Sequence, residues 1–234
     1  MNVISSKAFE FAECQVVAFT TALQLPTTAV LGALLAVEGV TFDGDPIILP
    51  PSMGSEVPHI VLTSKDGRHR IQAGQARLDV FRNLVPGEPI PSLETAVLSA
   101  FPLIEAYQLS SRATFKRLAV LTKRTVVVED PAKALASHFC QQRWLDGPLN
   151  RPREFELHAH KMFTLPGSVE VNSWFRCKTA TLSLPGDPRA IVAEQDLNTL
   201  SEREQEFDLP SVRDFLNTTV PAFDEILEKY FPSA

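Results

Sequence analysis

The chain has 234 residues, of which 44% are hydrophobic, and a formal net charge of −6 at pH 7, so it can bury a sizeable core as one compact unit. Its longest apolar run, AVLGALLAV, is too short to span a bilayer, and MNVISSKAFE lacks the basic start and apolar core of a signal peptide. Three cysteines at no metal-finger spacing, Cys14, Cys140 and Cys177, favour a reducing cytoplasm over a disulfide framework.

The first part of the chain predicts a strand, a short helix and a three-stranded antiparallel unit. Apolar residues at 9–19 indicate the strand, and the short helix is expected at 29–37. Prolines make residues 45–58 an extended connector. Asp66-Gly67 is a strong signal for a tight hairpin turn, because that turn requires positive φ. The three extended runs are residues 60–62, 70–72 and 78–81.

The second part repeats this plan after a long strand. Residues 114–128 are rich in β-branched residues, and we place this strand centrally, where it joins the two halves. Asp130-Pro131 opens a short helix that continues to Phe139. Turn residues at Pro166-Gly167 and at 185–187 separate three further extended runs. An apolar stripe then predicts a terminal helix over 212–230.

Two predicted helices share a proline pattern. The segments PSLETAVLSAFP and PSVRDFLNTTVP end at Pro102 and Pro221, and both continue amphipathically beyond that proline. A proline inside a helix kinks it, so we expect two helices that bend over the same kind of surface. The sequence therefore predicts an α+β fold of antiparallel sheets with covering helices. In this fold a strand-strand-strand-helix unit is duplicated, in halves of roughly 1–110 and 111–234.

Catalytic motifs are scarce. The sequence has no phosphate-binding loop, no dinucleotide fingerprint, no metalloprotease helix and no nucleophile elbow, so we expect no cofactor. The one metal-like pattern is His158-Ala159-His160, because alternation along a strand puts both imidazoles on one face. His138 and Cys140 are further candidate ligands from the predicted short helix. The alternative is two histidines on the solvent-facing side of a strand, with no metal.

Charge is distributed unevenly along the chain. Residues 65–124 contain ten basic and five acidic residues, whereas residues 201–234 contain three basic and eight acidic residues. The candidate binding residues of the basic part are Lys65, Arg68, Arg70, Lys123 and Arg124. Such a region can contact nucleic acid, can be an ordinary solvated surface, or can contact the acidic region of a second copy. The overall acidic charge disfavours nucleic acid.

Four pieces of the sequence form a recognisable series: the Asp66-Gly67 hairpin, the strand from Arg77 to Phe81, the segment from Asp196 to Asn198 and the terminal helix. In these pieces the chain resembles a sporadically distributed family of uncharacterised prokaryotic proteins of similar length. The resemblance implies the same order of hairpin, helix, late strand and terminal helix. The patchy occurrence of such proteins implies a mobile or defence-associated gene, and no site residue is carried over from the family.

We expect a non-catalytic cytoplasmic binding or assembly protein that engages a protein partner and forms a homodimer, within a prokaryotic defence or toxin–antitoxin-like system. An exposed sheet edge and an uncovered sheet face are the surfaces such a role would use. Two alternatives stay open at this point. One is a metal-dependent enzyme built on His158 and His160, and the other is a nucleic-acid-binding accessory protein that uses residues 65–124.

Overall fold

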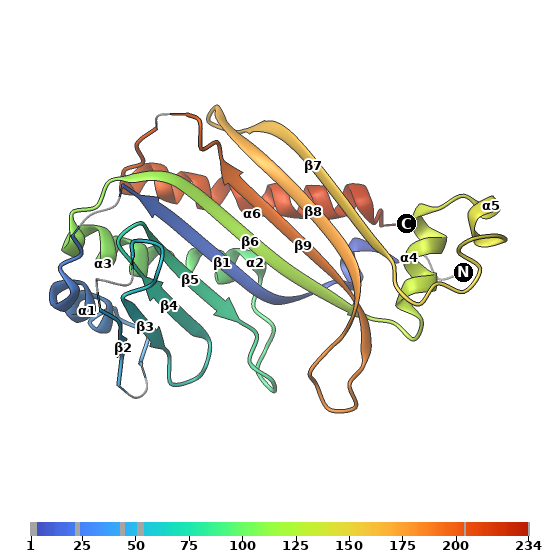
Figure 1. The fold of residues 1–234 in the computed structure, drawn as a ribbon, viewed down its shortest axis with the longest axis horizontal. Coiled ribbons are helices and arrows are strands. Elements are labelled where there is room, and N and C mark those ends of the chain that lie inside the picture. Colours follow the sequence, from blue (N-terminus) through green and yellow to red (C-terminus); the bar gives the residue numbers. More distant parts are fainter. Residues whose placement is uncertain (1–3, 22–23, 43–44, 51–53, 204, 234) are drawn as a thin grey trace.

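A single antiparallel sheet runs through the computed structural model, which describes residues 4–21, 24–42, 45–50, 54–203 and 205–233 (Figure 1). The elements of the first half are η1 Ser6–Ala8, β1 Glu10–Thr20, α1 Thr27–Leu35, β2 Ile47–Ile48, β3 Ile60–Thr63, β4 His69–Ala73, β5 Arg77–Asn83, α2 Leu93–Leu98 and α3 Phe101–Ser111. Those of the second half are β6 Phe115–Val127, α4 Pro131–Phe139, α5 Gln142–Leu145, β7 Glu156–Leu165, β8 Val169–Thr181, β9 Arg189–Thr199 and α6 Leu209–Tyr230.

In the described residues the sheet has nine strands in the order β2-β3-β4-β5-β1-β6-β9-β8-β7, and every pair is antiparallel. The predicted α+β class, with antiparallel strands and covering helices, is confirmed. The predicted central strand is β6, which pairs with β1 around Val16 and Val120 and so joins the two halves in one sheet. Outward from this pair the order is β1-β5-β4-β3 on one side and β6-β9-β8-β7 on the other. Duplication would give this order, but it stays a hypothesis.

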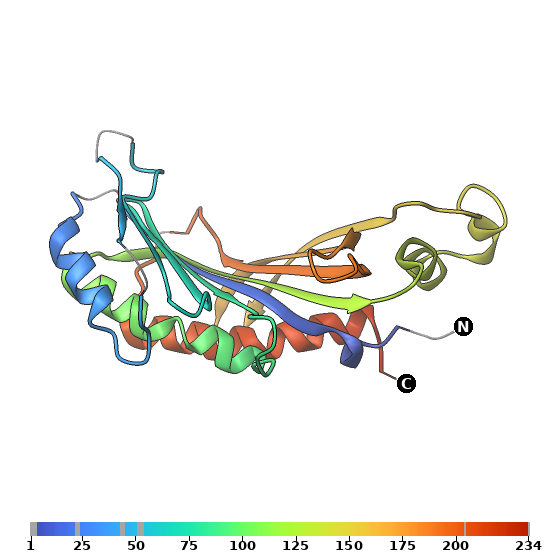
Figure 2. The same cartoon turned by 90° about the horizontal axis from the view of Figure 1, so that it is seen from below.

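The helices cover one face of the sheet. Figure 2 shows α2, α3 and α6 below the sheet, with α6 lying along most of its length. Side chains of a strand alternate between faces, so every second residue of the central strands points into this helix layer. Cys14 and Val16 of β1 and Leu118 and Val120 of β6 are buried there. The apolar face of α6 packs against the same core through Val212, Phe215, Leu216, Phe223, Ile226 and Leu227.

The predicted turns lie where the strands reverse. Gly67 has a φ of 72° between β3 and β4, and Gly167 and Gly186 both have a φ of 86° in the turns that follow β7 and β8. Asp130 caps α4 by accepting a hydrogen bond from the backbone N–H of Lys133. Within the connector predicted at 45–58 the structure has strand β2, while residues 51–53 lie outside the described residues.

The prediction of one kinked helix around Pro102 is wrong. The structure has two helices instead, α2 and α3, and Pro102 lies in the first turn of α3. A proline is tolerated in that turn because its missing N–H would have no partner there. Pro221, in contrast, lies inside the continuous helix α6. The two prolines therefore occupy different structural positions, one at a helix start and one inside a helix, although each follows its Pro-Ser pair at the same interval.

None of the helices within the described residues has the length and apolar character needed to cross a membrane.

Candidate functional site

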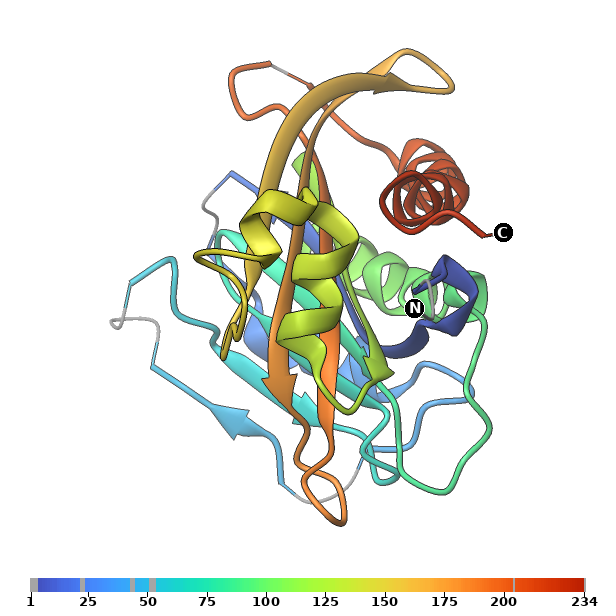
Figure 3. The same cartoon turned by 90° about the vertical axis from the view of Figure 1, so that its right-hand side faces the viewer.

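The face of the sheet opposite the helices is the candidate site. In Figure 2, β2 and β3 at one end and the β7–β8 ribbon with α5 at the other rise above the middle of this face. Figure 3 shows the same face from the end of the molecule, on the side away from α6. The register places alternate residues of each strand on it, and most of them are polar or charged. We call this surface the open face.

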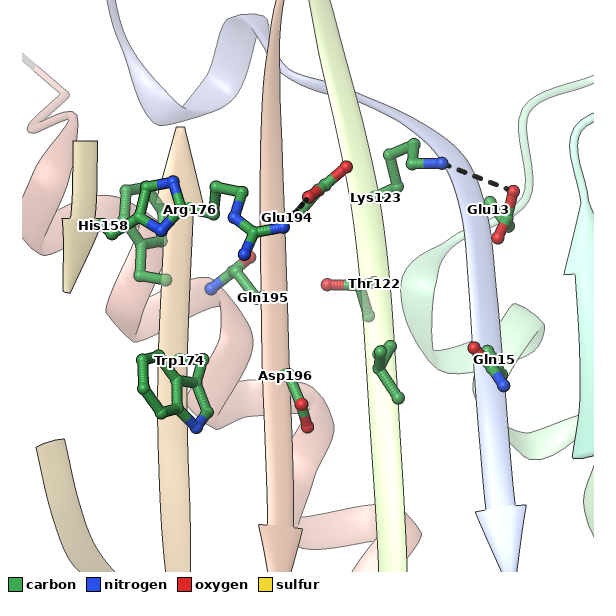
Figure 4. Close-up of a pocket in the computed structure, with 12 residues that line it drawn as sticks. Glu13, Gln15, Thr122, Lys123, His158, Trp174, Arg176, Glu194, Gln195 and Asp196 are labelled. Carbon is green, nitrogen blue, oxygen red and sulfur yellow. Dashed lines mark ion pairs between the residues drawn. The ribbon is translucent and has the colours of Figure 1, made fainter. Parts of the chain in front are cut away.

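A hollow of about 490 Å³ lies on the open face, mostly over strands of the second half, and we call it the groove. Five neighbouring strands line it, β1, β6, β9, β8 and β7 (Figure 4). The lining residues are Glu13, Gln15, Leu121, Thr122, Lys123, His158, Trp174, Phe175, Arg176, Glu194, Gln195 and Asp196. By the strand register, Thr122, Phe175 and Gln195 direct their side chains to the helix layer, and the other lining residues lie on the open face. Because β1, β6 and β9 are distant in sequence, only the folded sheet brings these residues together.

Most charges at one end of the groove are paired. Lys123 Nζ lies 3.6 Å from Glu13 Oε2, and Arg176 Nη1 lies 3.6 Å from Glu194 Oε2 (Figure 4). Lys178, just outside the groove, lies 3.0 Å from the other oxygen of Glu194. These pairs are partly exposed and contribute little to stability, on the order of 0–1 kcal/mol each. These pairs line the groove with charges of both signs.

Trp174 is the most exposed large aromatic group of the groove. The residue is 48% exposed, and its indole stacks on the ring of His160 with centroids 4.1 Å apart. The two residues are direct cross-strand neighbours on β8 and β7. His160 Nε2 also lies 3.2 Å from Asn172 Oδ1, which orients the imidazole. The structure therefore holds a large aromatic surface in position while leaving about half of it open to solvent.

Asp196 lies directly across from Trp174 on the neighbouring strand β9. Among the described residues it forms no ion pair, and its one side-chain hydrogen bond comes from Asn198 Nδ2 at 2.9 Å. Burial raises the pKa of Asp196, while the hydrogen bond from Asn198 and the charge of Arg117 act in the opposite direction. Figure 4 shows its carboxylate within the groove beside Trp174. The carboxylate thus retains acceptor capacity for a bound group.

Asp79 of β5 shows how the fold treats a comparable carboxylate in the first half. Gln15 Nε2 donates to its Oδ1 at 2.7 Å, and Arg77 Nε lies 2.9 Å from its Oδ2. Burial raises the pKa of Asp79 against the opposing effects of these two partners. Both carboxylate oxygens of Asp79 have a partner, whereas in the described part of the chain only Oδ1 of Asp196 accepts a side-chain hydrogen bond.

The four candidate metal ligands do not come together. His158 and His160 share the open face of β7, as alternation predicts. His158 Nε2 lies 2.6 Å from Glu156 Oε1. His138 lies on α4, where its Nε2 is 2.7 Å from the carbonyl oxygen of Tyr230, and Cys140 follows the same helix. In the described part of the chain no group of three or more His, Cys, Asp or Glu side chains is placed to hold a metal ion.

The candidate basic residues are divided between different surfaces. Lys65 and Arg68 lie at the β3–β4 turn, where Arg68 pairs with Glu88 at 2.5 Å. Arg70 lies over the ring of Phe81, 4.0 Å from its centroid, and so covers that aromatic side chain. The charge of this hairpin is therefore partly neutralised by its own neighbours.

Lys123 and Arg124 point to opposite faces of β6. Lys123 lines the groove, whereas Arg124 is only 8% exposed and faces the helix layer. Arg124 Nη1 lies 2.6 Å from Asp224 on α6, and its Nη2 donates to Gln195 Oε1 at 3.1 Å. Arg124 thus holds α6 to the sheet and does not belong to an open binding surface.

Cys14 and Cys177 carry no activated thiol. Burial raises the pKa of Cys14 and of Cys177 to about 12, so neither forms the nucleophilic thiolate at neutral pH. Both pack as small apolar side chains in the core.

Sequence reasoning did not single out Trp174. The available signal was its place in the alternation Asn172, Trp174, Arg176, where an aromatic residue shares a face with polar neighbours. Glu194 and Asp196 alternate in the sequence and so share a face of β9, but their position across from Arg176 and Trp174 of β8 is visible only in the sheet.

No protein-family model matches the chain, and no curated protein is similar to it in sequence. The function is therefore argued from the geometry of the groove.

Proposed function

We propose that this protein is a non-catalytic binding protein whose groove takes a segment of a protein partner. The observation that carries the proposal is the half-exposed Trp174 beside the incompletely bonded carboxylate of Asp196, inside a hollow with charges of both signs. Protein interfaces are enriched in aromatic residues and Arg at their centre and have a polar rim. Aromatic anchors of this kind account for most of the binding energy in many interfaces.

The charge of the groove favours protein over nucleic acid. Glu13, Glu194 and Asp196 outnumber Lys123 and Arg176, so the lining has a net charge of −1 with histidine counted as neutral. Nucleic-acid binding depends on an excess of cations along the phosphate backbone. The alternative based on residues 65–124 is weakened further, because Arg68 and Arg124 are paired with carboxylates.

The two histidines support binding better than metal chemistry. Glu156 is the partner of His158, and Trp174 and Asn172 are the partners of His160. We therefore assign His158 to the wall of the groove and His160 to the support of the Trp174 indole, and neither to a metal-dependent active site.

The wider setting is part of the same proposal. The three cysteines are unpaired, which fits the reducing cytoplasm we propose. In the described sheet β7 pairs with β8 alone, so its outer edge is available for strand pairing with a second copy in a homodimer. The defence or toxin–antitoxin-like role we propose rests on the pattern-level family resemblance.

A comparative capture experiment tests the proposal. The wild type, Trp174→Ala and Leu109→Ala are immobilised and exposed to extract of the native host. Leu109 is the matched control, because it is 68% exposed but lies on α3 in the helix layer. We expect one protein to bind the wild type and the Leu109 variant, and its affinity for Trp174→Ala to be about 30-fold weaker.

Equal capture by all three proteins would refute the groove as the binding site.

Elemental analysis of the purified protein is the second arm. Stoichiometric zinc, iron or manganese that is lost in a His158→Ala, His160→Ala double variant would favour the metal-dependent alternative.

A further inference from the structure

A second hollow, of about 600 Å³, lies at the opposite end of the molecule from α1, where α4 begins and the segment after α5 passes the start of β9 (Figure 1). Its lining comes from three segments that are distant in sequence: Asp130 and Lys133, residues 150–153, and Arg189. We call it the basic hollow. None of its residues lines the groove.

Four cations line the basic hollow, Lys133, Arg151, Arg153 and Arg189. None of them forms an ion pair or a side-chain hydrogen bond with any residue that the structure describes. Elsewhere in this acidic chain, arginines such as Arg68, Arg77 and Arg203 have carboxylate partners. The basic hollow, in contrast, brings together four cations that have no carboxylate partner among the described residues.

The carboxylate in the hollow does not neutralise these cations. Asp130 Oδ1 accepts the backbone N–H of Lys133 and so serves as the cap of α4. Counting Asp130 still leaves a net charge of +3 on the lining. Four like charges around one hollow repel one another, and this repulsion is relieved when an anion binds between them.

We propose that the basic hollow binds a small molecule with two linked phosphate groups. A single phosphate carries a charge of about −1.5 to −2 near neutral pH, so it leaves part of the +3 unbalanced, whereas a diphosphate matches it. The planar fork of arginine donates paired hydrogen bonds to phosphate oxygens, and three of the four cations are arginines. The volume falls within the range of about 300–1,000 Å³ typical of small-molecule sites.

Calorimetric titration with defined probes tests this site. Pyrophosphate, a nucleoside diphosphate, inorganic phosphate and sulfate are titrated into the full chain at fixed ionic strength. We expect both diphosphate probes to bind at least tenfold more tightly than phosphate or sulfate. If pyrophosphate binds as tightly as the nucleoside diphosphate, the phosphates alone are recognised; tighter binding of the nucleotide shows that the nucleoside also contacts the protein.

Charge-removing variants locate the site. Arg151→Gln and Arg189→Gln are each expected to weaken pyrophosphate binding at least fivefold. Arg143→Gln is the matched control, because Arg143 lies nearby on α5 over the ring of Trp144 but does not line the basic hollow. We expect it, and Trp174→Ala in the groove, to bind pyrophosphate within twofold of the wild type.

Three results would overturn the proposal. The first is no detectable pyrophosphate binding by a wild-type protein with a normal circular dichroism spectrum. The second is an equal loss in Arg143→Gln, which would show non-specific attraction to the charged end of the molecule. The third is tighter binding of single-stranded DNA or a polyglutamate peptide than of either diphosphate, which would assign the cations to a macromolecular polyanion. A negative result for the basic hollow does not bear on the proposed function of the groove, because the two tests use different residues and probes.

Discussion

Trp174 and Phe175 are consecutive residues of β8 whose truncation we expect to have very different costs. Phe175 points into the helix layer, is 2% exposed and stacks on Tyr230 with centroids 3.8 Å apart. Replacing a buried Phe with Ala typically costs 3–5 kcal/mol, about the sum of lost burial and the cavity left behind. Trp174 is about half exposed, so its truncation loses part of its burial and the stacking on His160, together about 1–2 kcal/mol.

Urea unfolding followed by far-ultraviolet circular dichroism measures both costs in the same buffer. We expect Phe175→Ala to lose about 1–4 kcal/mol more than Trp174→Ala in the free energy of unfolding, with little change in the urea slope for either. A Trp174→Ala variant that is as destabilised as Phe175→Ala would refute the reasoning. It would mean that the indole belongs to a core and that the open face is covered.

Two further predictions concern Asp196 and the prolines. Burial raises the pKa of Asp196 in the folded protein, so folding favours its protonated form; the stability linked to that protonation is fully present below the ordinary pKa of 3.8 and is lost as pH rises through the folded pKa. Asp196→Asn should therefore be more stable than the wild type at pH 7, by about 1.4 kcal/mol per unit of pKa shift, and equally stable near about pH 3. Urea unfolding at several pH values measures this difference, and an Asn variant that is less stable than the wild type at pH 7 would contradict the prediction. Pro221→Ala relieves about 3 kcal/mol of helix cost. If Pro221 bends α6, as the sequence predicts, the same change also loosens the packing of residues such as Phe223, whose burial is worth about 1.5–3 kcal/mol, so we expect little net change in thermal stability. Pro102→Ala, in the first turn of α3, should also change little, whereas a large rise in melting temperature for Pro221→Ala would refute a role for a bend at Pro221.

The sheet was predictable where local chemistry determines the backbone. Asp66-Gly67 specifies its hairpin because positive φ is required at that turn, and Gly67 adopts it. The β-branched run at 114–128 is the central strand β6, since such side chains suit a strand covered on one side by helices. The helix around Pro102 was mispredicted because proline is compatible both with a kink and with a helix start. Only the packing of α2 and α3 separates these two outcomes.

The candidate site was less predictable, because it depends on contacts across strands. Alternation correctly put His158 and His160 on one face of β7, but the sequence could not show that Glu156 and Trp174 would be their partners. Lys123 and Arg124 counted equally as basic residues in the sequence. One of them lines the groove and the other is buried against α6, because neighbouring residues of a strand face opposite ways.

Asp196 in the second half occupies the position in the sheet that Asp79 occupies in the first half. Counting outward from the central Val16–Val120 pair, Asp79 lies opposite Val17 and Asp196 lies opposite Leu121, so the two carboxylates occupy corresponding positions. The two carboxylates differ in the residue that lies two positions earlier on the same strand. For Asp79 this residue is Arg77, which pairs with it, whereas for Asp196 it is Glu194, whose negative charge repels the carboxylate of Asp196.

The cross-strand neighbours also give Asp79 more hydrogen-bonding partners than Asp196. The residue across from Asp79 on β4 is Gln72, and the residue across from Asp196 on β8 is Trp174. Gln15, which donates to Asp79, corresponds to Ala119 in the second half, and Ala119 has no side-chain donor. In the first half the carboxylate of Asp79 is bonded by an amide and a guanidinium, whereas in the second half the carboxylate of Asp196 lies beside the exposed indole of Trp174. An incompletely bonded carboxylate in a partly buried place costs stability, and occupation of the groove by a partner that donates to it would recover that cost.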